Sequence, residues 1–367
     1  MTISTRKAAL GGLAMFGVVA LLAACAPAPT ASNSTSGAAA SDFLPCIVSD
    51  FGGFQDKSFN QSSYEGITAA ADELGVEFKQ AESTTADQYA GNVTSMVDQG
   101  CNFILTVGFA LADATRDAAQ ANPDIQFAII DSALSNADFS PLTLDNVKPV
   151  LYDTAQAAYL AGYLAAGTST TGIVGTYGGL QFPSVTIFMD GFADGIAKYN
   201  EDKGANVKLL GWDKAAQTGA FAGSFDDIAA GKNASQSLID QGADVILPVA
   251  GPLFQGTAQA INDSGKAVAI VGVDSDLFET TPEFGPLYLT SVMKQMADAT
   301  KQIIVDAAGG TFSSESYVGT LENGGVLLAP LHDFESKVDP ALMTEIDALK
   351  ASIISGDIVV TSEATPQ

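Results

Sequence analysis

Histidine and the common catalytic motifs are nearly absent from this 367-residue sequence. It has one histidine, His332, so a zinc site built from histidines is excluded. It contains no G-x-S-x-G nucleophile motif, no G-x-x-x-x-G-K-[ST] phosphate-binding motif and no G-x-G-x-x-G motif after the first predicted strand. These absences disfavour covalent catalysis and phosphoryl transfer, so we expect a protein that is not an enzyme and that uses no metal or cofactor.

Basic residues are also scarce. The sequence holds 16 Lys and Arg against 42 Asp and Glu, which gives a formal net charge of −26 at pH 7. Such an acidic surface repels phosphate backbones and anionic lipid, so we expect no nucleic-acid partner. Solubility outside the cell is the ordinary explanation of the charge, which says little about a small ligand.

A long apolar run is absent except near the amino terminus, where one follows Arg6 and Lys7. This run is too short and wrongly flanked for a membrane-spanning helix and is typical of an export signal. It ends in Leu-Ala-Ala-Cys, which resembles the bacterial lipobox. That motif implies a signal peptide over residues 1–24, acylation of Cys25 and anchoring to the outer face of the cell membrane. Residues 25–41, rich in Ala, Pro, Ser and Thr, predict a flexible tether.

Cysteine is rare as well, since only Cys46 and Cys101 remain once Cys25 is lipidated. An exported chain permits oxidation. Cys46 begins the first predicted strand and Cys101 directly precedes another. In a doubly wound sheet of order 2-1-3 these strands are neighbours that start at the same end, so a disulfide is geometrically possible. Two buried free thiols are the alternative, because a disulfide requires a narrow range of Cα separation.

Beyond residue 41, short β-rich runs alternate with helical patterns, which predicts parallel α/β sheets with right-handed crossovers. The strands are too many for one such core, so we expect two lobes, each a doubly wound, mostly parallel sheet. Breaks rich in Gly, Pro and polar residues predict an N-terminal lobe of residues 42–150 and 288–312 and a C-terminal lobe of residues 151–287 and 313–367. Three crossings then leave a cleft at the carboxyl ends of both sheets, which suits hinged closure on a small molecule.

Residues 49–61 join the first predicted strand to a helical pattern, at the edge where open α/β sheets bind ligands. Ser58 and Gln61 fit a capping box at the start of that helix. The binding candidates of this stretch are Asp50, Phe59 and Asn60. They offer an acceptor, a flat apolar face and an amide, although a capped loop with ordinary surface polar groups is the alternative. We expect Asp56 and Lys57 to hold the turn.

Further carboxylates follow later predicted strands. They are Asp131 and Asp274, with Asp113 and Asp276 as nearby competitors. Ionised carboxylates only accept hydrogen bonds, so several of them facing one cleft suit a ligand rich in hydroxyl or N–H donors. The alternative for each is to cap the helix that follows its strand.

Two more residues extend the candidate set. Phe225, in Gly-Ser-Phe-Asp-Asp before a predicted helix, is either a second flat face opposite Phe59 or a buried core ring. Lys294 begins another predicted helix and is either a cation for a ligand oxygen or a solvated lysine. The glycine-rich run 175–179 predicts a tight turn after a strand.

Residues 50–60 resemble the Asp-x-Gly-Gly-x-x-Asp-Lys-Ser-Phe-Asn signature of the basic membrane protein (BMP) family of ABC-transporter substrate-binding lipoproteins, which includes purine nucleoside receptors. Gly-Ser-Phe-Asp-Asp at 223–227, Gly-Val-Asp-Ser-Asp at 272–276 and Thr-Ser-Val-Met-Lys at 290–294 extend the resemblance. It implies a two-lobed periplasmic-binding-protein fold of type I, monomeric and lipid-anchored, with permease and ATPase subunits as partners.

The resemblance also implies a purine nucleoside as ligand, held by an aromatic sandwich and aspartate hydrogen bonds. Asp50 and Asn60 would bond the base, between the rings of Phe59 and Phe225. The sugar would be held by Asp274, the Gly251 backbone, Lys294 and Asp131, with Asp113 and Asp276 as secondary candidates. Two other functions stay open. One is a non-transport sensor that presents its ligand to a signalling partner, and the other is a nucleoside-hydrolysing enzyme that uses the Asp50 and Asp56 region with a metal.

Overall fold

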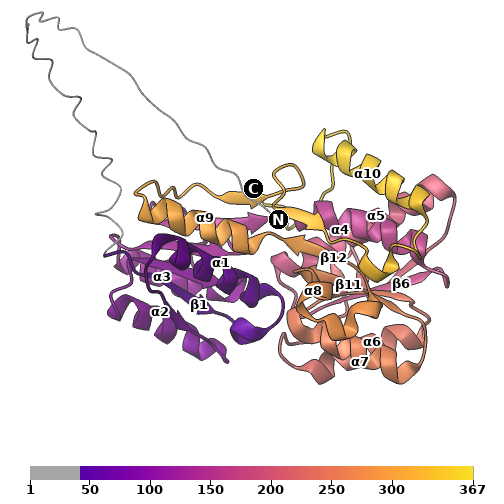
Figure 1. Ribbon diagram of the computed structural model, residues 1–367, viewed down its shortest axis with the longest axis horizontal. Coiled ribbons are helices and arrows are strands. Elements are labelled where there is room, and N and C mark those ends of the chain that lie inside the picture. Colours follow the sequence, from indigo (N-terminus) through magenta and orange to yellow (C-terminus); the bar gives the residue numbers. More distant parts are fainter. Residues whose placement is uncertain (1–41, 367) are drawn as a thin grey trace, which may run out of the picture. The chain divides into compact units, whose positions relative to one another are not determined.

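Two six-stranded sheets organise the described part of the chain, which comprises residues 42–366 of a computed structural model (Figure 1). The predicted signal peptide, Cys25 and nearly all of the predicted tether lie outside the described residues. Within 42–366, no helix combines the length and apolar character that crossing a bilayer would need. The doubly wound α/β organisation predicted from the sequence is confirmed.

The first sheet is parallel throughout, with strand order β13-β5-β4-β3-β1-β2. Its strands are β1 (Pro45–Ser49), β2 (Lys79–Ala81), β3 (Phe103–Val107), β4 (Gln126–Ile130), β5 (Val147–Tyr152) and β13 (Tyr317–Gly319). The helices beside it are α1 (Phe59–Leu74), α2 (Tyr89–Asp98), α3 (Ala112–Ala121) and α9 (Met296–Ala308). Side chains of β1 alternate between two cores: Ile47 belongs to the core that includes Ile67 of α1, and Val48 to the core that includes Val93 of α2.

The second sheet has the order β14-β12-β11-β10-β6-β7 and is parallel except for the antiparallel pair β12–β14. Its strands are β6 (Ile173–Gly178), β7 (Lys208–Leu210), β10 (Val245–Val249), β11 (Ala269–Asp274), β12 (Tyr288–Lys294) and β14 (Val326–Leu328). Its helices are α4 (Thr154–Thr168), α5 (Pro183–Lys203), α6 (Ile228–Asp240), α7 (Phe254–Ser264), α8 (Leu277–Thr280) and α10 (Pro340–Ile354). A Cβ on Gly195 would collide with the Tyr159 carbonyl oxygen, so this glycine lets α4 and α5 pack closely.

Short elements fill the connections. They are the hairpin β8 (Trp212–Asp213) and β9 (Thr218–Gly219), and the 3₁₀ turns η1 (Gly53–Gln55), η2 (Ala86–Gln88), η3 (Phe109–Leu111), η4 (Gly251–Leu253), η5 (Pro282–Leu287) and η6 (His332–Phe334). The glycine-rich run 175–179 is not the predicted turn, because most of it continues β6.

The chain passes between the two sheets three times, as predicted, after β5, β12 and β13. Two segments lie in sheets other than those assigned from the sequence. β12 pairs with β11 in the second sheet, and β13 pairs with β5 in the first. The Gly-Pro break before β12 is the short turn η5 within one lobe, so the chain crosses only at the carboxyl end of β12. Helix α9, which follows, packs on α1 of the first lobe.

Cys46 and Cys101 form a disulfide with a Cα separation of 6.0 Å. Both residues are buried. Cys46 lies in β1, and Cys101 precedes β3, its neighbour in the sheet. Of the two alternatives left open by the sequence, the structure has the bridge.

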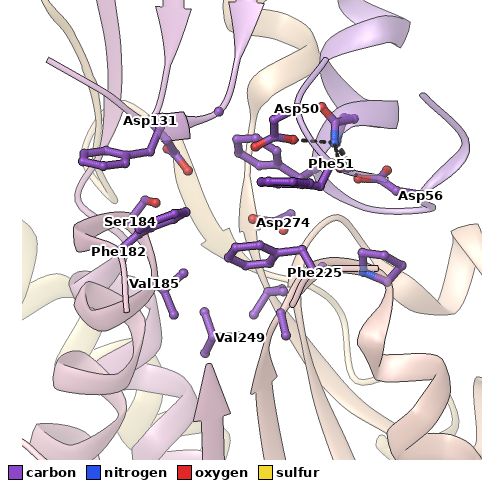
Figure 2. Close-up of a pocket in the computed structure, with 18 of the residues that line it drawn as sticks. Asp50, Phe51, Asp56, Asp131, Phe182, Ser184, Val185, Phe225, Val249 and Asp274 are labelled. Atoms are coloured by element: carbon purple, nitrogen blue, oxygen red, sulfur yellow. Dashed lines mark hydrogen bonds between the residues drawn. The ribbon is translucent and has the colours of Figure 1, made fainter. Parts of the chain in front are cut away.

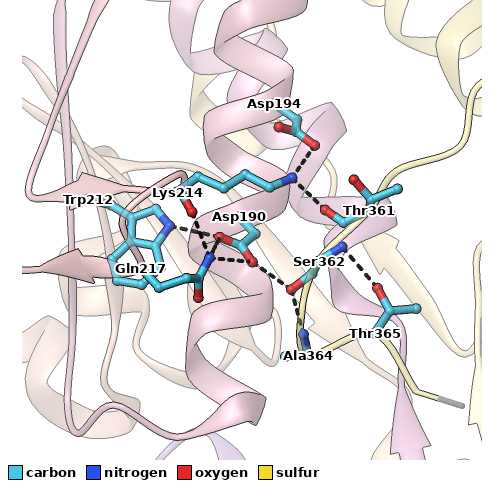
Figure 3. Close-up of polar contacts among 9 residues, drawn as sticks. All are labelled: Asp190, Asp194, Trp212, Lys214, Gln217, Thr361, Ser362, Ala364 and Thr365. Carbon is cyan, nitrogen blue, oxygen red and sulfur yellow. Dashed lines mark hydrogen bonds and ion pairs between the residues drawn. The ribbon is translucent and has the colours of Figure 1, made fainter.

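The last described segment of the chain is tied to α5 and to the β8–β9 hairpin (Figure 3). Its Ser362 hydroxyl donates to the buried Asp190 carboxylate of α5 at 2.6 Å. The Trp212 indole N–H donates to the same carboxylate at 2.9 Å. Lys214 reaches the Thr361 carbonyl oxygen at 2.5 Å. These contacts hold the segment against the second lobe.

Candidate functional site

A pocket lies where the strand ends of the two sheets meet (Figure 2). The structure brings together all the principal residues expected from the sequence: Asp50, Phe59, Asn60, Asp131, Phe225, Gly251, Asp274 and Lys294 all line it. They come from the first lobe at the ends of β1 and β4 and the start of α1, and from the second at the ends of β10, β11 and β12 and in the loop before α6, which carries Phe225. Carboxyl ends of parallel strands gather at one edge of a sheet, which explains why residues so far apart in sequence converge.

A buried ion cluster joins the two lobes at this pocket. Lys294, which is 4% exposed, forms an ion pair with Asp131 and lies 3.4 Å from Asp274. Burial by itself would lower the pKa of Lys294, but the charges of Asp131 and Asp274 outweigh burial and raise it. The amino group also lies 5.0 Å from the centre of the Phe59 ring. Lys294 therefore stays cationic and lies between two carboxyl groups, although burial still raises the pKa of Asp131 against the lowering effect of the lysine.

Both carboxylates of the cluster stand on strained backbone. Asp131 has φ of 62° and Asp274 has φ of 69°, in the left-handed region that residues other than glycine rarely adopt. Asp274 is held further by the Ser58 hydroxyl of the first lobe, which donates to its Oδ2 at 3.0 Å. Strain of this kind persists where surrounding contacts enforce it, and it is typical of ligand sites.

Asp50 and Asn60 form a second polar group of the pocket. The Asn60 amide nitrogen donates to Asp50 Oδ1 at 3.0 Å and to the Phe51 carbonyl oxygen at 3.0 Å. Burial raises the pKa of Asp50 to about 8, against the lowering effect of the Asn60 hydrogen bond, and the nearby carboxylates add to the rise. Within the described part of the chain, no cation contributes to the pKa of Asp50, whereas Lys294 supplies a positive charge beside Asp131 and Asp274.

Asp56 caps α1, so the capping box predicted from Ser58 and Gln61 was wrong. The Asp56 carboxylate accepts from the backbone N–H groups of Ser58 at 3.0 Å, Asn60 at 2.8 Å and Gln61 at 3.0 Å. The Ser58 hydroxyl is engaged by Asp274, and the Gln61 amide bonds one turn along the helix. By capping the helix, Asp56 fixes Asn60 in the lining of the pocket. Asp56 thus has the turn-holding role expected from the sequence.

Aromatic rings from both lobes face the pocket. Figure 2 shows Phe51 on the side of Asp50 and Phe225 on the opposite side. The Phe225 ring stacks on Phe182 with centres 5.9 Å apart. A Cβ on Gly179 would collide with the Phe225 ring, so this glycine makes room for it. Gly179 thus makes room for this ring, while the rest of the run 175–179 continues β6 instead of forming the predicted turn.

Four aromatic residues of the pocket escaped prediction: Phe51, Phe109, Phe182 and Phe188. Phe51 directly follows the strand-end Asp50, and its position was the one available signal. Phe182 and Phe188 belong to the start of α5, whose approach to the first lobe depends on packing across the pocket. No local pattern in the sequence reports such packing.

Asp113 and Asp276 lie outside the pocket. The Asp113 side chain is 83% exposed and pairs with Arg116 at 2.6 Å, because the turn η3 carries it beyond the strand end. Asp276 caps α8 by accepting from the Phe278 N–H at 3.2 Å and pairs with His332 at 2.7 Å. For Asp276 the helix-capping alternative holds.

Comparison with known proteins identifies the family. Residues 46–364 match the family described as ABC transporter substrate-binding protein, PnrA-like. The chain belongs to this family. It is 31% identical over 362 residues to the ABC transporter nucleoside-binding protein BmpA of Lactococcus lactis, covering 94% of this chain and 96% of that protein. It is 29% identical over 311 residues to Basic membrane protein A1 of Borrelia garinii, covering 84% and 86% of the two chains.

Among solved structures, an ABC transporter solute-binding protein from Aeropyrum pernix K1 is similar with a TM-score of 0.77 and 24% identity, covering 89% of this chain and 94% of that one. This likeness shows the fold, the two-lobed type I solute-binding architecture expected from the sequence. Members of the PnrA-like family bind solutes for ABC transporters and are not enzymes. The partners of such a protein are a small-molecule ligand and the permease and ATPase subunits of its transporter.

Proposed function

We propose that this PnrA-like receptor captures a purine nucleoside between its two lobes. The observation that carries the proposal is the composition of the pocket, in which aromatic rings and carboxylates of both lobes surround one buried lysine. A flat base needs apolar faces and a ribose needs hydrogen-bond acceptors, and this pocket has both. The 31% identical relative that is named a nucleoside-binding protein supports the same ligand class.

The base would lie between Phe59 of the first lobe and Phe225 of the second, with Phe51 beside it. Stacking on an aromatic side chain contributes about 1–3 kcal/mol per base. Asp50 and Asn60, joined by a 3.0 Å hydrogen bond, would contact the polar edge of the base. Stacking supplies affinity for any flat ring, and the polar edge supplies the choice among rings.

The ribose would lie at the ion cluster. Asp131 and Asp274 would accept hydrogen bonds from its hydroxyl groups, while Lys294 and the backbone at Gly251 would donate to its oxygens. Each carboxylate is already oriented by Lys294, so little ordering cost remains for binding. A ligand without those hydroxyls would leave buried acceptors unpaired, at about 1–3 kcal/mol each.

Capture would couple to closure of the lobes. Besides the ion cluster, the Thr280 hydroxyl donates to the Lys57 carbonyl oxygen at 2.9 Å, and the Ser275 hydroxyl donates to that of Ser58 at 3.3 Å. These contacts join the first-lobe turn before α1 to the second-lobe segment around α8. Closure would present both lobes as one surface to the permease.

Calorimetry of the full chain with adenosine, guanosine, inosine and uridine tests the proposal. We expect purine nucleosides to bind well below the millimolar range, with free ribose and free adenine much weaker because each makes half of the contacts. No binding of any nucleoside below millimolar concentration would refute the ligand assignment. Release of free base during the measurement would instead favour the hydrolase alternative, and absence of permease subunits from a crosslinked membrane preparation would favour the sensor.

We also infer that acylated Cys25 anchors the receptor to the outer face of the cell membrane, on the strength of the lipobox-like Leu-Ala-Ala-Cys. Cys25→Ala should leave the protein soluble after export, while the parent stays in the membrane fraction. Mass spectrometry of the amino-terminal peptide checks the lipid directly. An unmodified Cys25 in membrane-bound protein would contradict this anchor.

A further inference from the structure

Asp50 differs from the other three carboxylates of the pocket. Asp131 and Asp274 share Lys294, and Asp56 accepts from three backbone N–H groups. The only side-chain partner of Asp50 within residues 42–366 is the Asn60 amide nitrogen, which donates to Oδ1. Its other oxygen, Oδ2, accepts no hydrogen bond and pairs with no cation in that part of the chain. Asp50 is therefore the carboxylate whose charge the protein does least to stabilise.

The groups that face Asp50 from neighbouring elements disfavour its charge. Asp56 lies in the turn before α1, while Asp131 and Asp274 follow β4 and end β11, and all three are acidic. Tyr89 of α2 adds a phenol whose pKa burial raises, so it stays neutral. Among residues 42–366, the one cationic side chain that lines the pocket, Lys294, is occupied by Asp131 and Asp274. Burial, opposed by the Asn60 hydrogen bond and assisted by these carboxylates, raises the pKa of Asp50 to about 8.

Asn60 complements Asp50 in a defined way. Its amide nitrogen is fully used, because it donates to Asp50, to the Phe51 carbonyl oxygen and, at 3.3 Å, to Asp56. Its amide oxygen is buried and has no hydrogen-bond partner among the described residues. The residue is 1% exposed and lines the pocket. The Asn60 amide oxygen can therefore still accept one hydrogen bond, and a donor on the ligand would supply it.

We propose that Asp50 binds the base as a neutral carboxylic acid, with Oδ2 donating its proton to a base acceptor while Asn60 Oδ1 accepts from the adjacent N–H. This inference rests on the proposed function and specifies the ligand further. The matching edge has an acceptor next to an N–H, as N1 and the 6-amino group of adenine provide. Hypoxanthine offers the same pair in reversed order, with N1–H as the donor and O6 as the acceptor. An ionised Asp50 would instead require two donors, such as N1–H and the 2-amino group of guanine.

The first test is the pH dependence of adenosine affinity for the full chain, measured by calorimetry between pH 6 and 9.5. Binding that needs the protonated acid has constant affinity below the pKa of the free receptor and loses up to tenfold per pH unit above it. Heats measured in buffers of different ionisation enthalpy should show net proton uptake on binding above pH 8. Affinity that stays constant to pH 9.5, or that rises with pH as protons are released, would overturn the proposal.

The second test is Asp50→Asn, because an amide has the shape of a neutral carboxylic acid and keeps a donor at the Oδ2 position. We expect adenosine affinity within about threefold of the parent at pH 7 and no fall above pH 8. A carboxylate that acts as an acceptor predicts the opposite, a loss of a hundredfold or more, since a donor would then face a donor. Asp113→Asn, the same change outside the pocket, is the matched control and should leave affinity and pH profile unchanged.

A third measurement does not depend on any ligand. The side-chain carboxyl carbon of Asp50 can be titrated by NMR in the empty receptor, with Asp50→Asn to assign its signal. A midpoint above pH 7 supports the neutral acid even if no nucleoside binds, in which case only the proposed function fails. A midpoint below pH 5 overturns the inference whatever the ligand is. If the variant does not fold, the signal is assigned by its proximity to Asn60, and the same two outcomes apply.

Discussion

Replacing Lys294 by methionine tests the ion cluster that holds the floor of the pocket. The side chains of Lys294, Asp131 and Asp274 are at most 8% exposed. Methionine fills similar space but leaves two carboxylates unpaired and facing each other. Removing one partner of a buried ion pair costs about 3–5 kcal/mol. That is a large share of the roughly 5–15 kcal/mol that keeps a typical protein folded.

Urea unfolding at pH 7.5, followed by circular dichroism, measures this loss. The deficit should shrink at pH 5. Burial already raises the folded-state pKa of Asp131 against the opposing charge of Lys294, and removing the lysine raises it further above the unfolded-state value near 4. The added destabilisation therefore appears as pH rises and fades as the group is protonated. Adding Asp131→Asn to Lys294→Met should recover part of the stability, because it removes one of the two unpaired charges.

Lys301→Met is the matched control, since Lys301 forms an ion pair with Glu73 at 2.6 Å on the exposed side of α9. Exposed pairs of this kind contribute little, so unfolding of the control should match the parent. A loss below about 1 kcal/mol for Lys294→Met at pH 7.5 would show that the ion cluster does not stabilise the fold. Equal losses in Lys294→Met and Lys301→Met would contradict the prediction as well, because burial would then make no difference.

Three further predictions concern the aromatic wall, the disulfide and the carboxyl-terminal segment. Phe225→Ala should weaken purine nucleoside binding at least tenfold in calorimetry without unfolding the protein, and unchanged affinity would remove this ring from the site. Replacing Cys46 and Cys101 by alanine should lower the free energy of unfolding by about 2–4 kcal/mol in urea titrations, and equal stability would contradict the bridge. Asp190→Ala should shift the fluorescence of Trp212, the single tryptophan, to longer wavelength, and an unchanged spectrum would contradict their hydrogen bond.

The strand-end carboxylates were predictable because they follow from a local pattern and one topological rule. Asp50, Asp131 and Asp274 each end or follow an apolar strand, and parallel strands bring their carboxyl ends to the same edge. The order of the strands around β1 is the 2-1-3 order expected of a doubly wound sheet, which places Cys46 close to Cys101. The family signature then supplied the residues that pattern alone leaves ambiguous, such as Phe225 and Gly251.

Side-chain contacts that no strand-order rule fixes could not be predicted from the sequence. Ser58 has the local pattern of a helix cap, but Asp274, 216 residues away, takes its hydroxyl group and leaves the cap to Asp56. Gly179 has the look of a turn residue, but it makes room for the Phe225 ring. The sheet to which β12 belongs depends on which neighbour it meets after η5, and the Gly-Pro break before it carries no such information.

Selection of a purine nucleoside by the pocket can be measured by competition. The full chain is incubated with an equimolar mixture of adenosine, inosine, uridine, adenine and ribose, unbound molecules are removed, and mass spectrometry identifies what the denatured protein releases. We expect adenosine or inosine at close to one molecule per chain, with little uridine and no free base or sugar. Release of none of these compounds, or of ribose or adenine alone, would contradict this selection.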